Sequence, residues 1–127
     1  MTYKTTLKDE DYFAARVRYW LRFFSLGDWK VEIYRKKLID MSAACEFWKD
    51  SQGVHIMLNE DLAYRPSKPW INRLALHEVA HILLYHMKQL IYNRVVTDGM
   101  ADTAEHAVIR RLESALAAGL DSTARNK

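Results

Sequence analysis

The chain is poor in the residues that cross-link or punctuate a fold: it has one cysteine, two prolines and four glycines in 127 residues. A single cysteine excludes an internal disulfide and a cysteine-rich zinc site. Cys45 shares its strand parity with Ala43 and Phe47, which predicts a core position, because unpaired cysteines are among the most buried residues. Long apolar runs are also missing, so no segment is predicted to cross a membrane, and the first residues do not resemble a signal peptide. We therefore expect a cytoplasmic protein without a membrane partner.

What the chain does contain is ordinary for one globular domain. Half of its residues are hydrophobic and 28% are charged, which is enough to bury a core without disulfides. We find no repeat or linker, and we predict one domain over residues 1–120 with a polar, frayed tail over residues 121–127. The net charge of +3 allows an acidic or nucleic-acid partner but does not require one, and no nucleic-acid-binding signature is present.

The first part of the chain carries the pattern of one amphipathic helix. Thr6 and Asp9 have the spacing of a capping interaction, and Gly27 is a suitable stop, so these residues bound the predicted helix. Its apolar stripe follows helical spacing and consists of Phe13, Val17, Trp20, Leu21 and Phe24.

Three strands are predicted after this helix. Apolar and polar residues alternate over residues 28–37, which indicates a strand with one buried face. Two further runs, over residues 41–48 and 54–59, flank a polar connector that ends in Gly53, and this arrangement predicts a hairpin.

Two helices complete the chain. Helical periodicity returns from Trp70 to about Tyr92, with Ser67 as the predicted N-cap and Pro69 in the first turn. A last helix is predicted over residues 101–118. The sequence therefore predicts an α+β fold with an N-terminal helix, a small three-stranded sheet and two C-terminal helices.

The first of these two helices contains His77-Glu78-Val79-Ala80-His81, an H-E-x-x-H motif. Four residues advance a helix by about 400°, so the two imidazoles lie on one face and can bind one ion. Zinc accepts neutral imidazole nitrogens, and Glu78 is close enough to act as general base toward a zinc-bound water. The surrounding residues are apolar, so burying these polar side chains without a metal would be costly. We therefore predict Zn²⁺ bound by His77 and His81, with Glu78 as the catalytic residue.

A catalytic zinc needs a third protein ligand, and the last helix is the natural source. Glu105 lies in the middle of the apolar stripe of that helix, where a carboxylate needs a compensating charge, so we predict it as the third ligand. Two alternatives stay open. Asp102 and Glu105 also have the spacing of a capping box, in which Glu105 would only accept a backbone N–H at the helix start; this alternative fails if Asp98 caps the helix. His106, at the edge of the stripe, is the competing ligand.

The H-E-x-x-H motif, followed by a helix that carries Glu105, resembles the zincin metallopeptidases and among them the gluzincins. The size and order of elements are similar to minimal single-domain members of the kind often encoded by phages. The resemblance implies a hydrolase that cleaves peptide bonds in a peptide or protein substrate, with zinc held by His77, His81 and Glu105 and with Glu78 as the base. It also implies a small antiparallel sheet above the motif helix, with the substrate lying along an edge strand.

The sequence departs from the gluzincins in ways that leave other functions open. Ile109 replaces the acidic residue that often follows the ligand glutamate by four positions, and Asp102 is a candidate for orienting a ligand histidine instead. SprT-like proteases, which act on DNA-bound proteins, use a later histidine, which would promote His106. A non-catalytic zinc domain that binds a protein or a nucleic acid is the third interpretation. The oxyanion donor is not fixed by spacing, since four residues are chemically able: Tyr64, Tyr92, Arg94 and His106.

Overall fold

The computed structural model describes residues 2–48, 51–85, 88, 98–113 and 116. In chain order the elements are β1 (Tyr3–Lys4), α1 (Leu7–Phe23), β2 (Lys30–Lys36), β3 (Ala43–Phe47), β4 (Gly53–Asn59), β5 (Asp61–Leu62), α2 (Lys68–Leu83) and α4 (Asp98–Leu112). This is an α+β fold, as the sequence predicted, because strands and helices occupy separate stretches of the chain. Within these residues, no helix combines the length and the apolar character needed to cross a membrane.

The main sheet has three strands in the order β2-β4-β3. β3 and β4 pair antiparallel, with Cys45 opposite Ile56, which confirms the predicted hairpin. β2 runs parallel to β4, with Ile33 opposite Ile56, so the sheet is mixed and the expectation of an antiparallel sheet is wrong. The reason is topological: β3 reverses the chain between β2 and β4, so these two strands point the same way and β3 takes the outer edge. β1 and β5 form a separate antiparallel pair.

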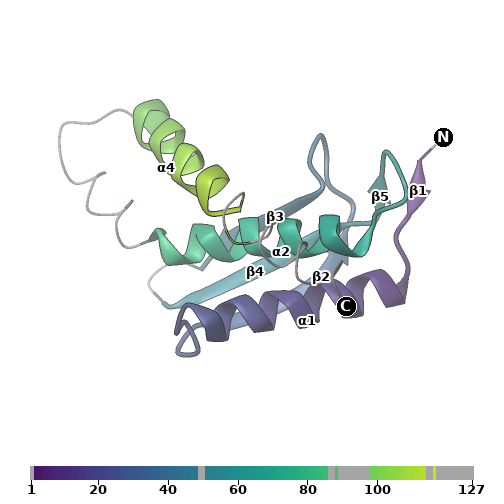
Figure 1. Cartoon of the computed structure of the whole chain (residues 1–127), viewed down its shortest axis with the longest axis horizontal. Helices are drawn as coiled ribbons and strands as arrows, with labels where there is room; N and C mark the ends of the chain where they lie inside the picture. The colour runs from purple at the N-terminus through teal and green to yellow at the C-terminus, as the bar shows by residue number, and fades with distance from the viewer. Residues whose placement is uncertain (1, 49–50, 86–87, 89–97, 114–115, 117–127) are drawn as a thin grey trace.

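Helices α1 and α2 lie side by side over one face of this sheet (Figure 1). The predicted apolar stripe of α1 is confirmed: Phe13, Val17, Trp20 and Leu21 are buried, and Phe24 packs against them. The inward residues of β4 and one face of α2 complete the core with Val54, Ile56, Leu58, Ile71, Ala75, Leu76, Val79 and Ile82. Burial of each large side chain contributes roughly 1.5–3 kcal/mol, so α2 is fixed by apolar contacts along its length.

The predicted N-caps of α1 and α2 are both confirmed. Thr6 Oγ1 accepts a hydrogen bond from the Asp9 backbone N–H at 3.2 Å, and the Asp9 carboxylate accepts one from the Thr6 N–H at 2.9 Å. Ser67 Oγ accepts from the Trp70 N–H at 3.2 Å, and Pro69 lies in the first turn of α2. Both helices therefore begin where side-chain chemistry satisfies their first backbone donors.

The predicted stop of α1 at Gly27 is wrong. The helix ends at Phe23, and Ser25 adopts a positive φ of 57°. The Leu26 N–H then bonds to the Leu21 carbonyl at 2.8 Å, which closes the last turn before Gly27 is reached.

Helix α4 lies against α2 on the side away from α1 (Figure 1). It begins at Asp98, three residues before the predicted start, so Asp102 lies inside the helix and does not form a capping box with Glu105. Ile109 is fully buried and Glu105 is 4% exposed, which confirms that Glu105 faces inward.

The prediction that the motif helix runs to about Tyr92 is wrong, because α2 ends at Leu83, where the N–H of the C-cap residue Leu84 bonds back to the Ala80 carbonyl. Other predictions fall on residues outside the described part of the chain. These are the end of the last helix at residue 118 and the polar tail over residues 121–127. The single domain over residues 1–120 likewise stays a prediction.

Candidate metal centre

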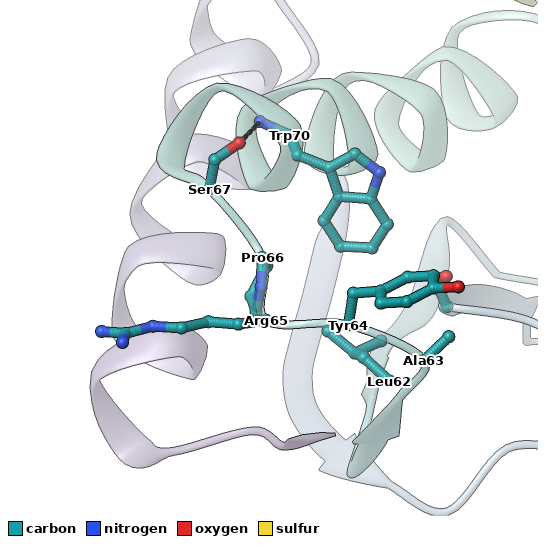
Figure 2. Close-up of a pocket in the computed structure, with 8 residues that line it drawn as sticks. Leu62, Ala63, Tyr64, Arg65, Pro66, Ser67 and Trp70 are labelled. Carbon is teal, nitrogen blue, oxygen red and sulfur yellow. Dashed lines mark hydrogen bonds between the residues drawn. The ribbon is translucent and has the colours of Figure 1, made fainter. Parts of the chain in front are cut away.

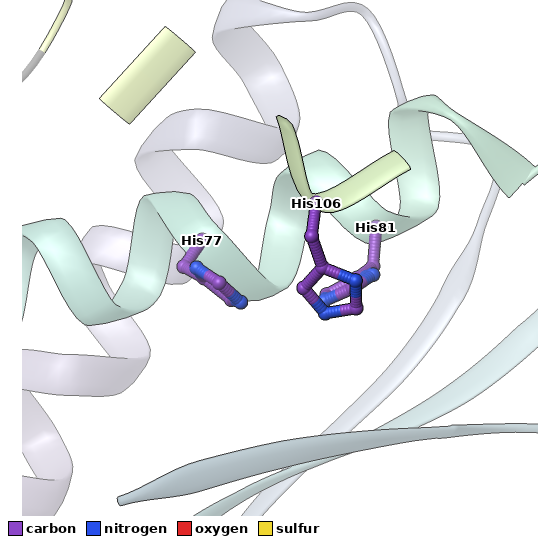
Figure 3. A group of neighbouring side chains, drawn as sticks. All are labelled: His77, His81 and His106. Carbon is purple, nitrogen blue, oxygen red and sulfur yellow. The ribbon is translucent and has the colours of Figure 1, made fainter. Parts of the chain in front are cut away.

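Three histidines from two helices converge beside the sheet. His77 and His81 project from one face of α2, and His106 reaches them from α4 (Figure 3). One nitrogen of each ring lies within 4.8 Å of the other two. The ring centroid of His81 is 5.1 Å from the centroids of both His77 and His106. Small side-chain rotations suffice to bring three nitrogens at this spacing to one ion.

Two of these rings have an acceptor at Nδ1. His77 Nδ1 is hydrogen-bonded to the carboxylate of Glu113, the residue after α4. His106 Nδ1 donates to the backbone carbonyl of Asp102 at 2.8 Å. A neutral imidazole that carries its proton on Nδ1 has its lone pair on Nε2, which is then the nitrogen available to a metal.

The third ring has the Glu105 carboxylate beside its Nδ1. His81 Nδ1 lies 3.4 Å from Glu105 Oε1. Burial lowers the pKa of His81, opposed by the negative charge of Glu105, whereas the hydrogen bond to Glu113 raises the pKa of His77. Metal-binding histidines characteristically have such a partner at the second nitrogen, because it fixes the tautomer and the ring orientation.

The position of Glu105 bears on the choice of the third ligand. The residues that lie within metal-binding distance of one another include His106 and not Glu105. Glu105 Oε1 instead contacts His81 Nδ1, on the opposite side of that ring from Nε2. The geometry thus favours His106, the alternative that the sequence left open, while Glu105 as a ligand stays an untested prediction.

Glu78 lies in the same site and is 4% exposed. Burial raises the pKa of its carboxyl group to about 7, and the neighbouring His77 opposes this change. A hydrogen bond with the Cys45 thiol also favours the charged form. A carboxyl group with a pKa near neutrality is suited to accept and release protons.

A cleft of about 640 Å³ opens onto these residues between β3, α2 and α4. Ala43, Ala44, Cys45 and Phe47 form its β3 side. Cys45 is half-buried, and although it packs against the core as predicted, it also lines this cleft. Burial raises the pKa of the Cys45 thiol, so it stays protonated beside Glu78. Among the described residues β3 pairs with β4 alone, so the other edge of this cleft-lining strand is an outer edge of the sheet.

The charges around the three rings are mostly negative. Glu78, Glu105 and Glu113 contribute three carboxylates, and Asp102 lines the cleft beside them. Lys88 contacts Asp102 at 2.7 Å and Glu105 at 3.2 Å, and these contacts raise its pKa although burial opposes them. An excess of carboxylates around three imidazoles fits a divalent cation.

Sequence reasoning missed Lys88 and Glu113, although a signal for both was present. Each follows a candidate ligand by seven residues, Lys88 after His81 and Glu113 after His106, and this spacing returns to the same face of a helix. Asp102 does orient a histidine, but through its backbone carbonyl, since its carboxylate pairs with Lys88.

The remaining oxyanion candidates lie elsewhere. Tyr64 is 85% exposed in the loop before α2, and Tyr92 and Arg94 lie outside the described residues. His55 is also remote from the three rings, on the outer side of β4, where its Nδ1 is 3.0 Å from the Tyr34 hydroxyl.

Comparison with known proteins adds no relative. No protein-family model matches the chain, and neither a curated protein nor a solved structure is measurably similar to it. The functional argument therefore depends on the motif and on the geometry around it.

Proposed function

We propose that this chain is a zinc-dependent metallopeptidase that hydrolyses peptide bonds, with His77, His81 and His106 as ligands and Glu78 as general base. One observation carries the proposal: one nitrogen of each imidazole lies within 4.8 Å of the other two, and an oxygen lies beside Nδ1 of every ring, which would leave Nε2 for a common ion. A polar surface cluster formed by chance would not be expected to satisfy the same nitrogen three times.

The chain's own residues supply most of what hydrolysis needs. His77, His81 and His106 would hold Zn²⁺, which would supply Lewis acidity toward water and the substrate carbonyl. Glu78 accepts a proton from the attacking water and returns it to the leaving amine, two tasks that suit a pKa near 7. The outer edge of β3 offers backbone donors and acceptors to an extended peptide, as in other strand-addition complexes.

A histidine as third ligand favours a SprT-like protease over a gluzincin, and this is the second candidate function. Such an enzyme would act on DNA-bound proteins, and the net charge of +3 agrees with a nucleic-acid partner. DNA binding that weakens steeply with salt would support this candidate, because phosphate contacts release counterions. A cytoplasmic location remains part of the proposal and agrees with the single cysteine.

Zinc content of matched variants tests the ligand set. We expect about one zinc per wild-type chain, loss of that zinc in His106→Ala, and retention in Glu105→Ala with affinity lowered about 10- to 100-fold. Elemental analysis after gel filtration measures the first two results, and competition with a chelator measures the third. Zinc lost from Glu105→Ala but kept by His106→Ala would instead restore Glu105 as the third ligand.

Glu78→Gln separates catalysis from metal binding. The amide keeps the size of the side chain but accepts no proton, so hydrolysis of an unfolded protein should fall about 10²- to 10⁴-fold while zinc content is unchanged. Rates are measured on wild type and variant at equal zinc loading. A wild type that binds zinc but hydrolyses nothing would favour the non-catalytic zinc domain.

A further inference from the structure

A second cavity, mainly apolar, lies at the N-terminal end of α2 (Figure 2). It measures about 320 Å³ and is formed by the loop between β5 and α2 together with the first turn of the helix. Leu62, Tyr64, Pro66 and Trp70 supply its apolar walls. Figure 2 shows the rings of Tyr64 and Trp70 on one side of the loop, while Arg65 points to the other. This volume is at the lower end for ligand sites, which suits one side chain better than a cofactor.

The aromatic walls of this cavity are exposed, and the backbone that carries them is restrained. Tyr64 is 85% exposed and Trp70 is 39% exposed. Single exposed aromatic residues are common, but these two line the same hollow. The hydrogen bond from the Trp70 N–H to Ser67 Oγ fixes the start of α2, and Pro66 restricts the loop. A binding surface that is ordered beforehand loses little entropy when a ligand enters.

The apolar cavity is continuous with the metal centre. A third cavity, of about 440 Å³, shares Ser42 and Trp70 with the apolar cavity. It shares Met41, His77 and Glu78 with the cleft at the three histidines. The three cavities therefore adjoin one another in a row along α2, from Trp70 to the candidate metal centre, and we call this row the groove.

Asn59 holds the wall of this groove opposite α2. Its side chain is buried, and Nδ2 donates to the carbonyls of Leu38 at 3.0 Å and Met41 at 2.7 Å. The Asn59 backbone N–H also bonds to the Ser42 carbonyl at 2.9 Å. The connector between β2 and β3 is thus fixed at the two residues that line the groove, Met41 and Ser42.

The distance along the groove sets the register of a bound peptide. Trp70 precedes His77 by seven residues, which is about 10.5 Å along a helix. An extended peptide rises about 3.3 Å per residue, so it covers this distance in about three residues.

We propose that the Tyr64–Trp70 cavity is a specificity subsite for a large apolar side chain, aromatic or aliphatic, about three residues from the cleaved bond. The inference rests on the proposed peptidase function and names its substrate class: extended peptides with such a side chain at one fixed position.

The test maps cleavage sites in a mixture of unstructured peptides with the zinc-loaded wild type, Trp70→Ala and Tyr64→Ala. For the wild type we expect large apolar residues to be enriched at one position, two to four residues from the cut. The ratio of kcat/KM between a peptide with phenylalanine there and the same peptide with alanine should be about 10- to 100-fold. In Trp70→Ala this ratio should fall close to one, because the phenylalanine peptide loses a contact that the alanine peptide does not make. Tyr64→Ala, at a more exposed position, should lower the ratio without a folding penalty.

Two controls keep the result interpretable. Phe23→Ala removes an aromatic side chain that is 53% exposed on α1, outside the groove, and should leave the ratio unchanged. Zinc content and circular dichroism of each variant confirm the metal centre and the fold. A wild type without a fixed apolar preference, or the same preference in Trp70→Ala and Tyr64→Ala, overturns the subsite while the peptidase function stands. A zinc-loaded wild type that cleaves no peptide overturns both.

Discussion

The two helices that carry the candidate ligands are attached to the protein by different forces. In α2, the residues between and beside His77 and His81 are buried in the core: Ala75, Leu76, Val79 and Ile82. In the described part of α4, Ile109 is the one fully buried hydrophobic side chain. Polar contacts also hold this region. Lys88 pairs with Asp102 and Glu105. Glu105 lies beside His81, and Glu113, the residue after α4, pairs with His77.

We call α1, α2 and the sheet the apolar half of the protein, and α4 with its polar contacts the metal-dependent half. The difference between them indicates which part of the site is formed without the metal. Apolar burial positions His77 and His81 regardless of any ion, since it depends only on the core. His106, in contrast, is held among carboxylates whose mutual repulsion a divalent cation would relieve. We therefore expect zinc binding to be coupled to the docking of α4 but not to the folding of α1, α2 and the sheet.

The largest effect should come from breaking the apolar half at Trp20. This side chain is 1% exposed, and its Nε1 donates to Asn72 Oδ1 on α2 at 3.0 Å. Trp20→Ala should lower the free energy of unfolding by about 3–5 kcal/mol, because it leaves a cavity between α1 and α2. Urea denaturation of the zinc-free protein measures the loss.

Trp70→Ala is the matched control for this prediction. It makes the same substitution at a side chain that is 39% exposed, so the loss of stability should be clearly smaller. Equal losses from the two variants would mean that the contact between α1 and α2 does not dominate the stability of this half.

Removal of zinc should affect the two halves differently. At a zinc concentration of 100 times Kd, a ligand stabilises the bound state by about 2.7 kcal/mol, so amides of α4 should exchange up to about 100-fold faster once zinc is chelated. Amides of α1 and β4 should remain the slowest to exchange in the zinc-free protein. Hydrogen exchange with mass spectrometry compares the segments. If chelation accelerated amide exchange in α1 and β4 as much as in α4, zinc would be required for the folding of all these elements.

The apolar half is also the part that the sequence predicted best. The stripe of α1 and the alternation in β2 are periodic signals, and they are recognisable because one face of each element packs against the core. The caps at Thr6 and Ser67 were predictable because their bonds are local. The parallel pairing of β2 with β4 was not predictable from the sequence, because it joins residues about 23 positions apart and depends on tertiary topology.

The candidate site was predictable only in part, for the same reason. His77, Glu78 and His81 are placed by one helix, so their spacing defines their geometry. The choice between Glu105 and His106 depends on how α4 rotates against α2, which spacing along one helix does not determine. Adjacent residues differ by about 100° around a helix, and here that rotation puts His106 among the other rings and Glu105 behind His81.

The smallest effect separates the two halves most cleanly. Thr6→Ala removes the side-chain acceptor for the Asp9 N–H at the start of α1, which should lower the free energy of unfolding by about 1 kcal/mol. Thr6→Ser keeps the acceptor oxygen and should recover most of this loss. Because α1 lies on the side of α2 away from α4, zinc affinity should be the same in wild type and both variants. Thermal unfolding and competition with a chelator measure the two quantities. A drop in zinc affinity that accompanied the loss of the cap would show that the apolar half and the metal-dependent half do not respond independently.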